Sequence, residues 1–239
     1  MKHCRNCHAP IASEYCPECG QKDVDLARPM TDLIKELLKE TFEVDGRAFR
    51  TVRTLFLQPG TLTTEFLAGR RRAYTPPLRL YIVISVTFFV VVAWLARQGV
   101  LLDTGQSIDA DAPGQAQFLS DELPRFMFVL LPIFAVLLKI ATPSRLYFDH
   151  LIFSVHLHSV AYVVLVFMLP LEHVSHWLPI GVQVLLFAYL LSNFVISFHR
   201  VYAANWTVAV SKSLAVLLAY LMLFTILVET ASSLRILSD

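Results

Sequence analysis

The four cysteines are the residues of the chain best placed to do chemistry. They form two Cys-x-x-Cys pairs with an eight-residue spacer between them: Cys4, Cys7, Cys16 and Cys19. Two residues between cysteines allow a tight turn that points both sulfurs at one ion, and the spacer can form a hairpin that returns the second pair to the first. Because four thiolates suit a tetrahedral ion and close the site to water, the spacing predicts a zinc ribbon with a structural zinc ion.

Other interpretations of the cysteines are weaker. A thioredoxin-like redox pair needs a Cys-x-x-Cys at a helix start after a strand in a βαβ unit, and nothing in the sequence predicts that context. No apolar signal segment precedes the first pair, so we expect residues 1–77 to stay in the cytoplasm, where thiols remain reduced. His3 and His8 could replace a sulfur, but the four cysteines already complete the site.

A second group of polar residues lies within an apolar segment. His150, His156 and His158 lead into a predicted membrane span, where polar side chains are costly unless they find partners. On a helix, His156 and His158 lie roughly 9 and 12 Å beyond His150 and differ by about 200° around the axis. The two therefore face different partners and do not form the i, i+4 pair that grips one metal ion.

Later spans add polar residues at similar depths, and together they could form a pocket. The possible pocket residues are His150, His156, His158, Asn193, Arg200 and Lys212. Three interpretations remain open: interhelical hydrogen bonding, a small-molecule or ion pocket, and a haem or catalytic metal, of which haem is the least favoured. His173 and His176 form a separate i, i+3 pair that could take a metal. No Ser-His-Asp order, phosphate-binding glycine loop or HExxH run is present, so no reaction type follows.

The composition places most of the chain in a bilayer. Of 239 residues, 56% are hydrophobic and 16% are charged, and the mean hydropathy is +0.58, which is too apolar for an ordinary soluble domain. A formal net charge of +1 provides no global attraction for nucleic acid. We predict an all-α integral membrane protein with a small N-terminal zinc ribbon, with the lipid bilayer as its main partner.

Five apolar stretches are long enough to cross a hydrocarbon core of roughly 30 Å. They are residues 78–96, 123–142, 151–170, 178–198 and 207–228. The second contains Pro132 and carries Lys139 near its end, and its loss would reverse the direction of every later span. Five spans put the two ends of the chain on opposite sides of the membrane.

Charges in the connecting segments assign the two sides. The segment between the first two spans is acidic, with Asp103, Asp109, Asp111, Asp121 and Glu122. The basic residues fall on the other side of the membrane: Arg70, Arg71, Arg72, Arg79, Lys139, Arg145, Arg200 and Lys212. Because positive charge marks cytoplasmic segments, we expect the N-terminus and the zinc inside and the C-terminus outside. We interpret the arginines at 70–72 as an orienting cluster rather than a lipid-headgroup or ligand site.

Three short helices are predicted between the ribbon and the first span. Apolar residues at helical spacing mark an amphipathic helix over 30–42. A second helix has apolar residues on one side, namely Phe49, Val52, Leu55 and Phe56, and three arginines on the other. The arginine side is basic enough for this helix to rest on a membrane surface. Thr61 can cap a third helix that ends at Gly69. The predicted domains are the ribbon (1–28), amphipathic cytoplasmic helices (29–77), a transmembrane bundle (78–230) and a tail (231–239).

Several motifs carry a family resemblance over most of the chain. They are the four cysteines with Gly20 and Gln21, Gln58-Pro59-Gly60, Gly69 to Arg72 with Tyr74 and Pro76, and Asp149-His150. In these motifs the chain resembles a bacterial domain-of-unknown-function family of inner-membrane proteins with an N-terminal zinc ribbon and a multi-pass helical domain. The resemblance implies an architecture and an inner-membrane location, and it implies no activity or catalytic residue.

Two functions follow as hypotheses. The first is a non-enzymatic inner-membrane protein whose zinc ribbon and amphipathic helices bind a cytoplasmic protein or fold against the bundle, in an interaction or regulatory role. The alternative is a membrane-embedded transporter or enzyme that uses the polar pocket. A closed bundle favours the first hypothesis, and a water-filled cavity lined by the pocket residues favours the second. Neither enzymatic activity nor oligomeric state follows from the sequence.

Overall fold

The computed structural model describes residues 2–23, 47–97, 123–168, 171 and 178–236. The predicted helix over 30–42, the acidic segment and the pair His173 and His176 lie outside these residues. The described helices are α2 (Ala48–Leu57), α3 (Thr61–Leu67), α4 (Pro77–Arg97), α6 (Leu123–Ala141), α7 (Tyr147–Met168), α8 (Leu178–Tyr202) and α9 (Trp206–Ile236).

The described strands form one small antiparallel hairpin, in which β1 (Lys2–His3) pairs with β2 (Pro10–Ile11). Both belong to residues 2–23, which we call the cysteine module. Because the rest of the described secondary structure is helical, the predicted all-α class is confirmed.

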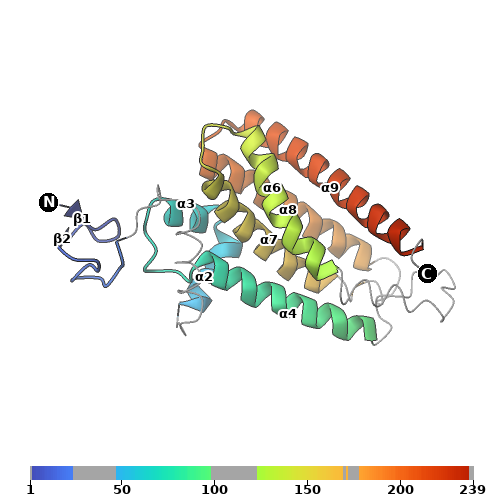
Figure 1. Cartoon of the computed structure of the whole chain (residues 1–239), viewed down its shortest axis with the longest axis horizontal. Coiled ribbons are helices and arrows are strands. Elements are labelled where there is room, and N and C mark those ends of the chain that lie inside the picture. Colours follow the sequence, from blue (N-terminus) through green and yellow to red (C-terminus); the bar gives the residue numbers. More distant parts are fainter. Residues whose placement is uncertain (1, 24–46, 98–122, 169–170, 172–177, 237–239) are drawn as a thin grey trace.

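Four of the described helices are long and apolar enough to cross a membrane. The segments are Pro77–Leu95, Tyr147–Met168, Ile180–Tyr202 and Trp206–Leu227. The prediction of a membrane protein is therefore supported for four of the five spans. The remaining helix, α6, occupies the predicted residues and contains Pro132, but its described apolar part, Met127–Ala141, is shorter. It nonetheless packs in the same bundle, beside α7 and α9 (Figure 1).

The helices of the bundle alternate in direction (Figure 1). Helices α4, α7 and α9 run away from the cysteine module, and α6 and α8 run toward it. The module therefore lies at the same end as the α6–α7 and α8–α9 connections, and α9 finishes at the other end. Helix α9 continues to Ile236, beyond the predicted end of the last span at residue 228.

Helix α7 is the centre of the bundle. Of its apolar segment 56% is buried, against 11% for α9. Phe153 packs with Phe134 of α6 and Phe198 of α8, and Val155 lies in a cluster with Phe88 of α4. An apolar helix can be surrounded by other helices or by lipid, and α7 is the one that other helices surround.

Helix α4 is displaced along α7. Tyr81, in the second turn of α4, meets Tyr162, in the fifth turn of α7, with 3.4 Å between the hydroxyl oxygens. Because both helices run in the same direction, α4 leaves the first half of α7 uncovered on one side. Helices α2 and α3 cover it: Phe66 packs on Phe148, and Leu55 lies in a cluster with Val160.

The buried face of α2 differs from the apolar side expected from the sequence. Of Phe49, Val52, Leu55 and Phe56, only Leu55 is fully buried, and it is joined by Thr51 and Thr54. The Thr51 hydroxyl accepts a 2.8 Å hydrogen bond from the backbone N–H of Thr75 and donates one of 2.9 Å to the Arg47 carbonyl. A satisfied polar contact thus takes the place expected for Phe49, and Phe56 is only partly buried at this interface.

Candidate metal centre and buried polar residues

The cysteine module consists of two turns with the same backbone hydrogen bonds. In the first, the backbone N–H of His8 donates to the Cys4 carbonyl at 2.9 Å, and in the second, Gly20 donates to the Cys16 carbonyl at 2.9 Å. Both donors have positive φ, 63° for His8 and 67° for Gly20. Each Cys-x-x-Cys pair is therefore closed by a left-handed residue that turns the chain so that two sulfurs face the same point.

The four sulfurs converge. All lie within 4.8 Å of one another, with 3.6 Å between Sγ of Cys4 and Cys19 and 3.5 Å between Sγ of Cys7 and Cys16. Four sulfurs about 2.3 Å from a central zinc ion at tetrahedral angles stand about 3.8 Å apart. The described cysteines are free rather than disulfide-bonded, so the cluster can hold a metal ion and is compatible with zinc.

The thiols of the cluster differ in acidity. Burial raises the pKa of Cys4, but hydrogen bonds from the backbone and from the neighbouring thiols together lower the pKa to about 7. For Cys7 a backbone hydrogen bond at Ala9 lowers the pKa, but desolvation and the three neighbouring cysteines raise it to about 12. Crowded thiols resist simultaneous ionisation, and a bound cation removes that conflict because it stabilises every thiolate.

Gln21 attaches the module to the membrane domain. Its side-chain N–H donates to the Gly69 carbonyl at 2.6 Å, and its Oε1 accepts from the backbone N–H groups of Arg71 at 3.0 Å and Arg72 at 3.2 Å. Gly69 has φ 82°, and a Cβ there would lie 2.5 Å from Cδ of Arg5. The module therefore docks on the turn between α3 and α4.

The arginines of this turn have defined contacts. Arg70 forms a two-pronged ion pair with Glu65, with 2.7 Å between its Nε and Oε2, and this hydrogen bonding holds the pKa of Glu65 below its usual range. The guanidinium of Arg71 lies 4.4 Å from the centroid of the Phe66 ring, a cation–π arrangement. These charges stabilise the turn in addition to any orienting effect.

The turn between α2 and α3 packs directly on α8. Gly60 has φ 78°, and a Cβ there would lie 2.9 Å from Cα of Ser197. Arg200 donates to the Pro59 carbonyl at 2.5 Å and to the Thr61 hydroxyl at 2.7 Å. The expectation that Thr61 caps α3 is wrong, because Gly60 occupies the cap position and Thr61 is the first helical residue. Gly69 follows the end of α3 in the left-handed conformation, as expected.

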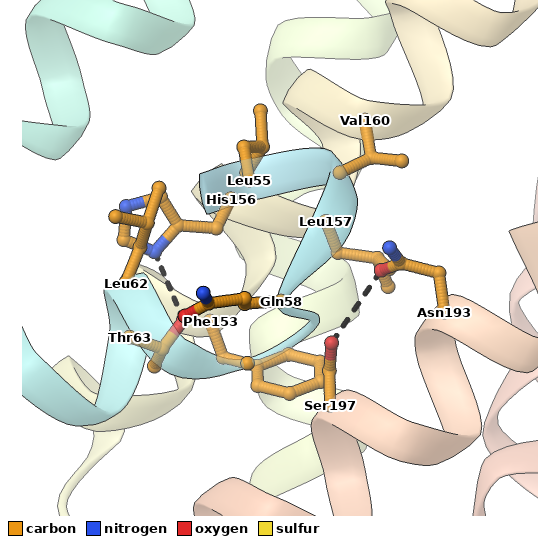
Figure 2. A pocket seen from close by; sticks show the side chains of 11 residues that line it. Leu55, Gln58, Leu62, Thr63, Phe153, His156, Leu157, Val160, Asn193 and Ser197 are labelled. Atoms are coloured by element: carbon orange, nitrogen blue, oxygen red, sulfur yellow. Dashed lines mark hydrogen bonds between the residues drawn. The ribbon is translucent and has the colours of Figure 1, made fainter. Parts of the chain in front are cut away.

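His156 and Asn193 line one small cavity (Figure 2). The His156 Nδ1 atom lies 2.9 Å from the Thr63 hydroxyl, and Asn193 accepts a 3.4 Å hydrogen bond from Ser197. The surrounding side chains are mostly apolar and come from α2, α3, α7 and α8. The enclosed space suits about one water molecule, so this cavity is too small for an organic substrate.

The other predicted pocket residues lie in separate contacts. His158 Nδ1 donates to the Ser154 carbonyl at 2.8 Å, since a carbonyl only accepts, and its Nε2 lies 2.9 Å from the Tyr220 hydroxyl. His150 Nδ1 lies 2.8 Å from the Tyr202 hydroxyl, and its buried Nε2 has no hydrogen-bond partner among the described residues. Lys212 donates to the Ala141 carbonyl at the end of α6 at 2.6 Å. Of the six, His156 and Asn193 line the cavity described above.

A polar stripe on α7 was not expected from the sequence. His150, Ser154, His158 and Tyr162 follow one another at intervals of four residues, and all are buried. Their partners come from different helices, with Tyr202 on α8, Tyr220 on α9 and Tyr81 on α4. The i, i+4 spacing is the signal in the sequence that could have revealed the stripe.

Comparisons with known proteins found a similar family for part of the chain. A search of curated proteins and a search of solved structures each found no match. A family model described as "Protein of unknown function (DUF3667)" matches residues 45–89. The matched segment contains α2, α3, the turn that binds Gln21 and the first part of α4. In this segment the chain is similar to a family of unknown function, in agreement with the resemblance noted from its motifs.

Proposed function

We propose that this chain is a multi-pass inner-membrane protein whose zinc ribbon is held at the cytoplasmic end of the bundle as a docking element for a cytoplasmic protein. The observation that carries the proposal is the set of three hydrogen bonds made by Gln21. A ribbon on a loose tether samples many orientations, whereas a ribbon fixed on the bundle presents one surface and loses less entropy on binding.

The alternating helices support the orientation. The cysteine module shares one end of the bundle with Arg145 in the α6–α7 connection and Arg200 in the last turn of α8, and positive charge favours the cytoplasmic side. In the proposal α6 is a fifth span, because it packs along α7 and α9, so the C-terminus lies outside.

Zinc is the ion that the four-sulfur cluster suits best, in a structural role. A site with four protein ligands has no open position for substrate or water. Binding free energies on the order of 10–16 kcal/mol in small zinc peptides are large enough to fold a module with only two strands of two residues each.

The surface offered to a partner is the exposed part of the module. Tyr15, between the two cysteine pairs, is 53% exposed, and exposed tyrosines are frequent anchors in protein interfaces. Arg5 and Gln21 contact the turn that follows α3. We infer that Tyr15 is central to the docking surface.

Site-specific photocrosslinking in cells tests this function. A photoreactive amino acid is placed at Tyr15 of the full-length chain, and a matched probe is placed at the exposed Ser144 in the α6–α7 connection at the same end. We expect one discrete protein adduct from position 15 that is absent from position 144 and is lost with Cys16→Ser. No adduct at position 15, or the same adduct from both positions, contradicts the docking function.

The cavity beside His156 supports a second candidate, movement of protons or water through the bundle. It combines a buried imidazole with Asn193 and Ser197, yet its size excludes larger solutes. Proteoliposomes that contain a pH-sensitive dye distinguish the two functions under an imposed membrane potential. Docking predicts no proton flux above that of empty liposomes, and a flux that is lost with His156→Ala would favour the second function.

A further inference from the structure

Helix α2 exposes large apolar side chains on the face opposite its buried threonines. The exposed fraction is 80% for Phe49, 67% for Leu57 and 38% for Val52. On the other face Thr51 and Leu55 are buried. A helix with one face buried normally turns polar residues outward, so the exposed apolar residues of α2 indicate a second apolar environment.

The position of α2 identifies that environment as the bilayer. Leu55 shares a cluster with Leu80 of α4 and Val160 of α7, and the Phe56 ring stacks on Tyr189 of α8 at 6.5 Å between centroids. Helix α2 thus packs on the side of the bundle between α4 and α8, which are both apolar enough to cross a membrane. The face that points away from α7 is on the flank of the bundle, where lipid surrounds a membrane protein.

Two arginines stand on the same exposed side. Arg50 and Arg53 are both exposed, and neither has an ion pair with a residue in the described part of the chain. On a helix, Arg53 lies between Phe49 and Leu57, and Arg50 lies about 20° beyond Leu57. Apolar and cationic side chains therefore share one surface, the arrangement of helices that lie at the headgroup level of anionic membranes.

We propose that α2 is a binding site for anionic phospholipid, in which Arg50 and Arg53 bind the phosphate headgroup and Phe49 and Leu57 contact the acyl chains. The proposal rests on the membrane placement given above and is independent of the docking function. It differs from simple burial in lipid because it requires a negatively charged headgroup. Arginine is suited to this role since its guanidinium can donate two parallel hydrogen bonds to a phosphate.

Lipid titration of the full-length protein in a neutral detergent tests the site. The probes are fluorescent phosphatidylglycerol, which is anionic, and phosphatidylcholine, which has no net charge. We expect phosphatidylglycerol to bind more tightly, and the pair Arg50→Gln and Arg53→Gln to weaken its binding about 25-fold, since one basic residue contributes about fivefold near a membrane surface. Phe49→Ser with Leu57→Ser should weaken the binding of both lipids.

Matched variants separate this site from general charge. The control pair Lys2→Gln and Arg72→Gln removes two positive charges at the same end without touching α2, and it should keep wild-type affinity. Arg50→Lys with Arg53→Lys should keep most of the preference for phosphatidylglycerol, since the charge remains. Equal affinity of the Gln pair and wild type, an equal loss in the control pair, or full competition by inorganic phosphate at millimolar concentration would overturn the proposal.

Discussion

His8 holds a backbone conformation that costs the cysteine module free energy. His8 closes the first Cys-x-x-Cys turn as Gly20 closes the second, and both residues have positive φ. For an L-residue with a Cβ this conformation costs about 1 kcal/mol. We expect His8→Gly to raise the stability of the module by about that amount and to leave its metal content unchanged. Competition with a chelator at increasing concentration measures both.

A matched change at His3 distinguishes this account from metal binding by histidine. His3 lies in β1, where glycine has no conformational advantage, so His3→Gly should lower stability slightly. A loss of metal with His8→Gly would mean that the imidazole is a ligand, and the account of four sulfur ligands would then be wrong.

Gly60 is the second residue whose backbone a side chain would disturb. An added Cβ would lie 2.9 Å from the backbone of Ser197, and φ is 78°. We expect Gly60→Ala to lower the free energy of unfolding by about 2–4 kcal/mol, from the left-handed conformation and the clash together. Thermal unfolding in detergent measures the change.

Gly181→Ala is the control for this substitution. Gly181 lies in α8 with no atom within 4 Å of an added Cβ, so alanine should leave stability unchanged or raise it by up to about 1 kcal/mol. If Gly60→Ala unfolds at the same temperature as Gly181→Ala, the turn does not pack on α8 as described.

At the scale of elements, α3 is attached to α7 by one buried hydrogen bond. Thr63→Val keeps the shape of the side chain but leaves Nδ1 of His156 without its 2.9 Å partner. We expect a loss of about 1–3 kcal/mol in the free energy of unfolding, the usual cost of a buried unsatisfied polar group. Unfolding in a denaturing detergent mixture measures the loss.

The neighbouring threonine provides the comparison. Thr64 donates to the Gly60 carbonyl within its own helix at 3.0 Å and is half-buried, so Thr64→Val should cost less. Removing both buried partners, with Thr63→Val and His156→Leu together, should recover part of the loss. If the double change recovers none of the lost stability, or if Thr63→Val leaves the free energy of unfolding unchanged, the contact between α3 and α7 is not as described.

The elements themselves were largely predictable from the sequence. Hydrophobic runs and their periodicity mark α4 and α6 to α9 because the helix period and the length of a span are local properties. The buried face of α2 was not predictable. Thr51 is buried instead of Phe49 because of the contact with Thr75 and the displacement of α4. Both are tertiary contacts that the local sequence does not indicate.

The candidate sites divide in the same way. The cysteine cluster was predictable because all four cysteines lie in one short segment, and the converging sulfurs follow from spacing alone. The polar pocket was only partly predictable. The depth of a residue along its helix follows from the local sequence, but the neighbour that its side chain faces depends on how the helices pack. Arg200 donates to the Pro59 carbonyl and Lys212 to the Ala141 carbonyl, so each stabilises a chain turn or a helix end.

At the scale of the whole molecule, the cysteine module and the membrane domain act as one structure. The module contacts the turn after α3, α3 contacts α7, and α7 is the centre of the bundle. Loss of the metal should therefore loosen more than residues 2–23, because the contacts of Gln21 depend on the fold of the module.

Metal analysis of the purified full-length protein tests the central claim most directly. Elemental mass spectrometry is applied to wild type, to Cys16→Ser and to the pair His156→Ala with His158→Ala. The account predicts one zinc ion per chain in wild type and in the histidine pair, and none in Cys16→Ser. Wild-type protein without zinc, zinc retained by Cys16→Ser, or a metal lost only with the histidine changes would contradict it.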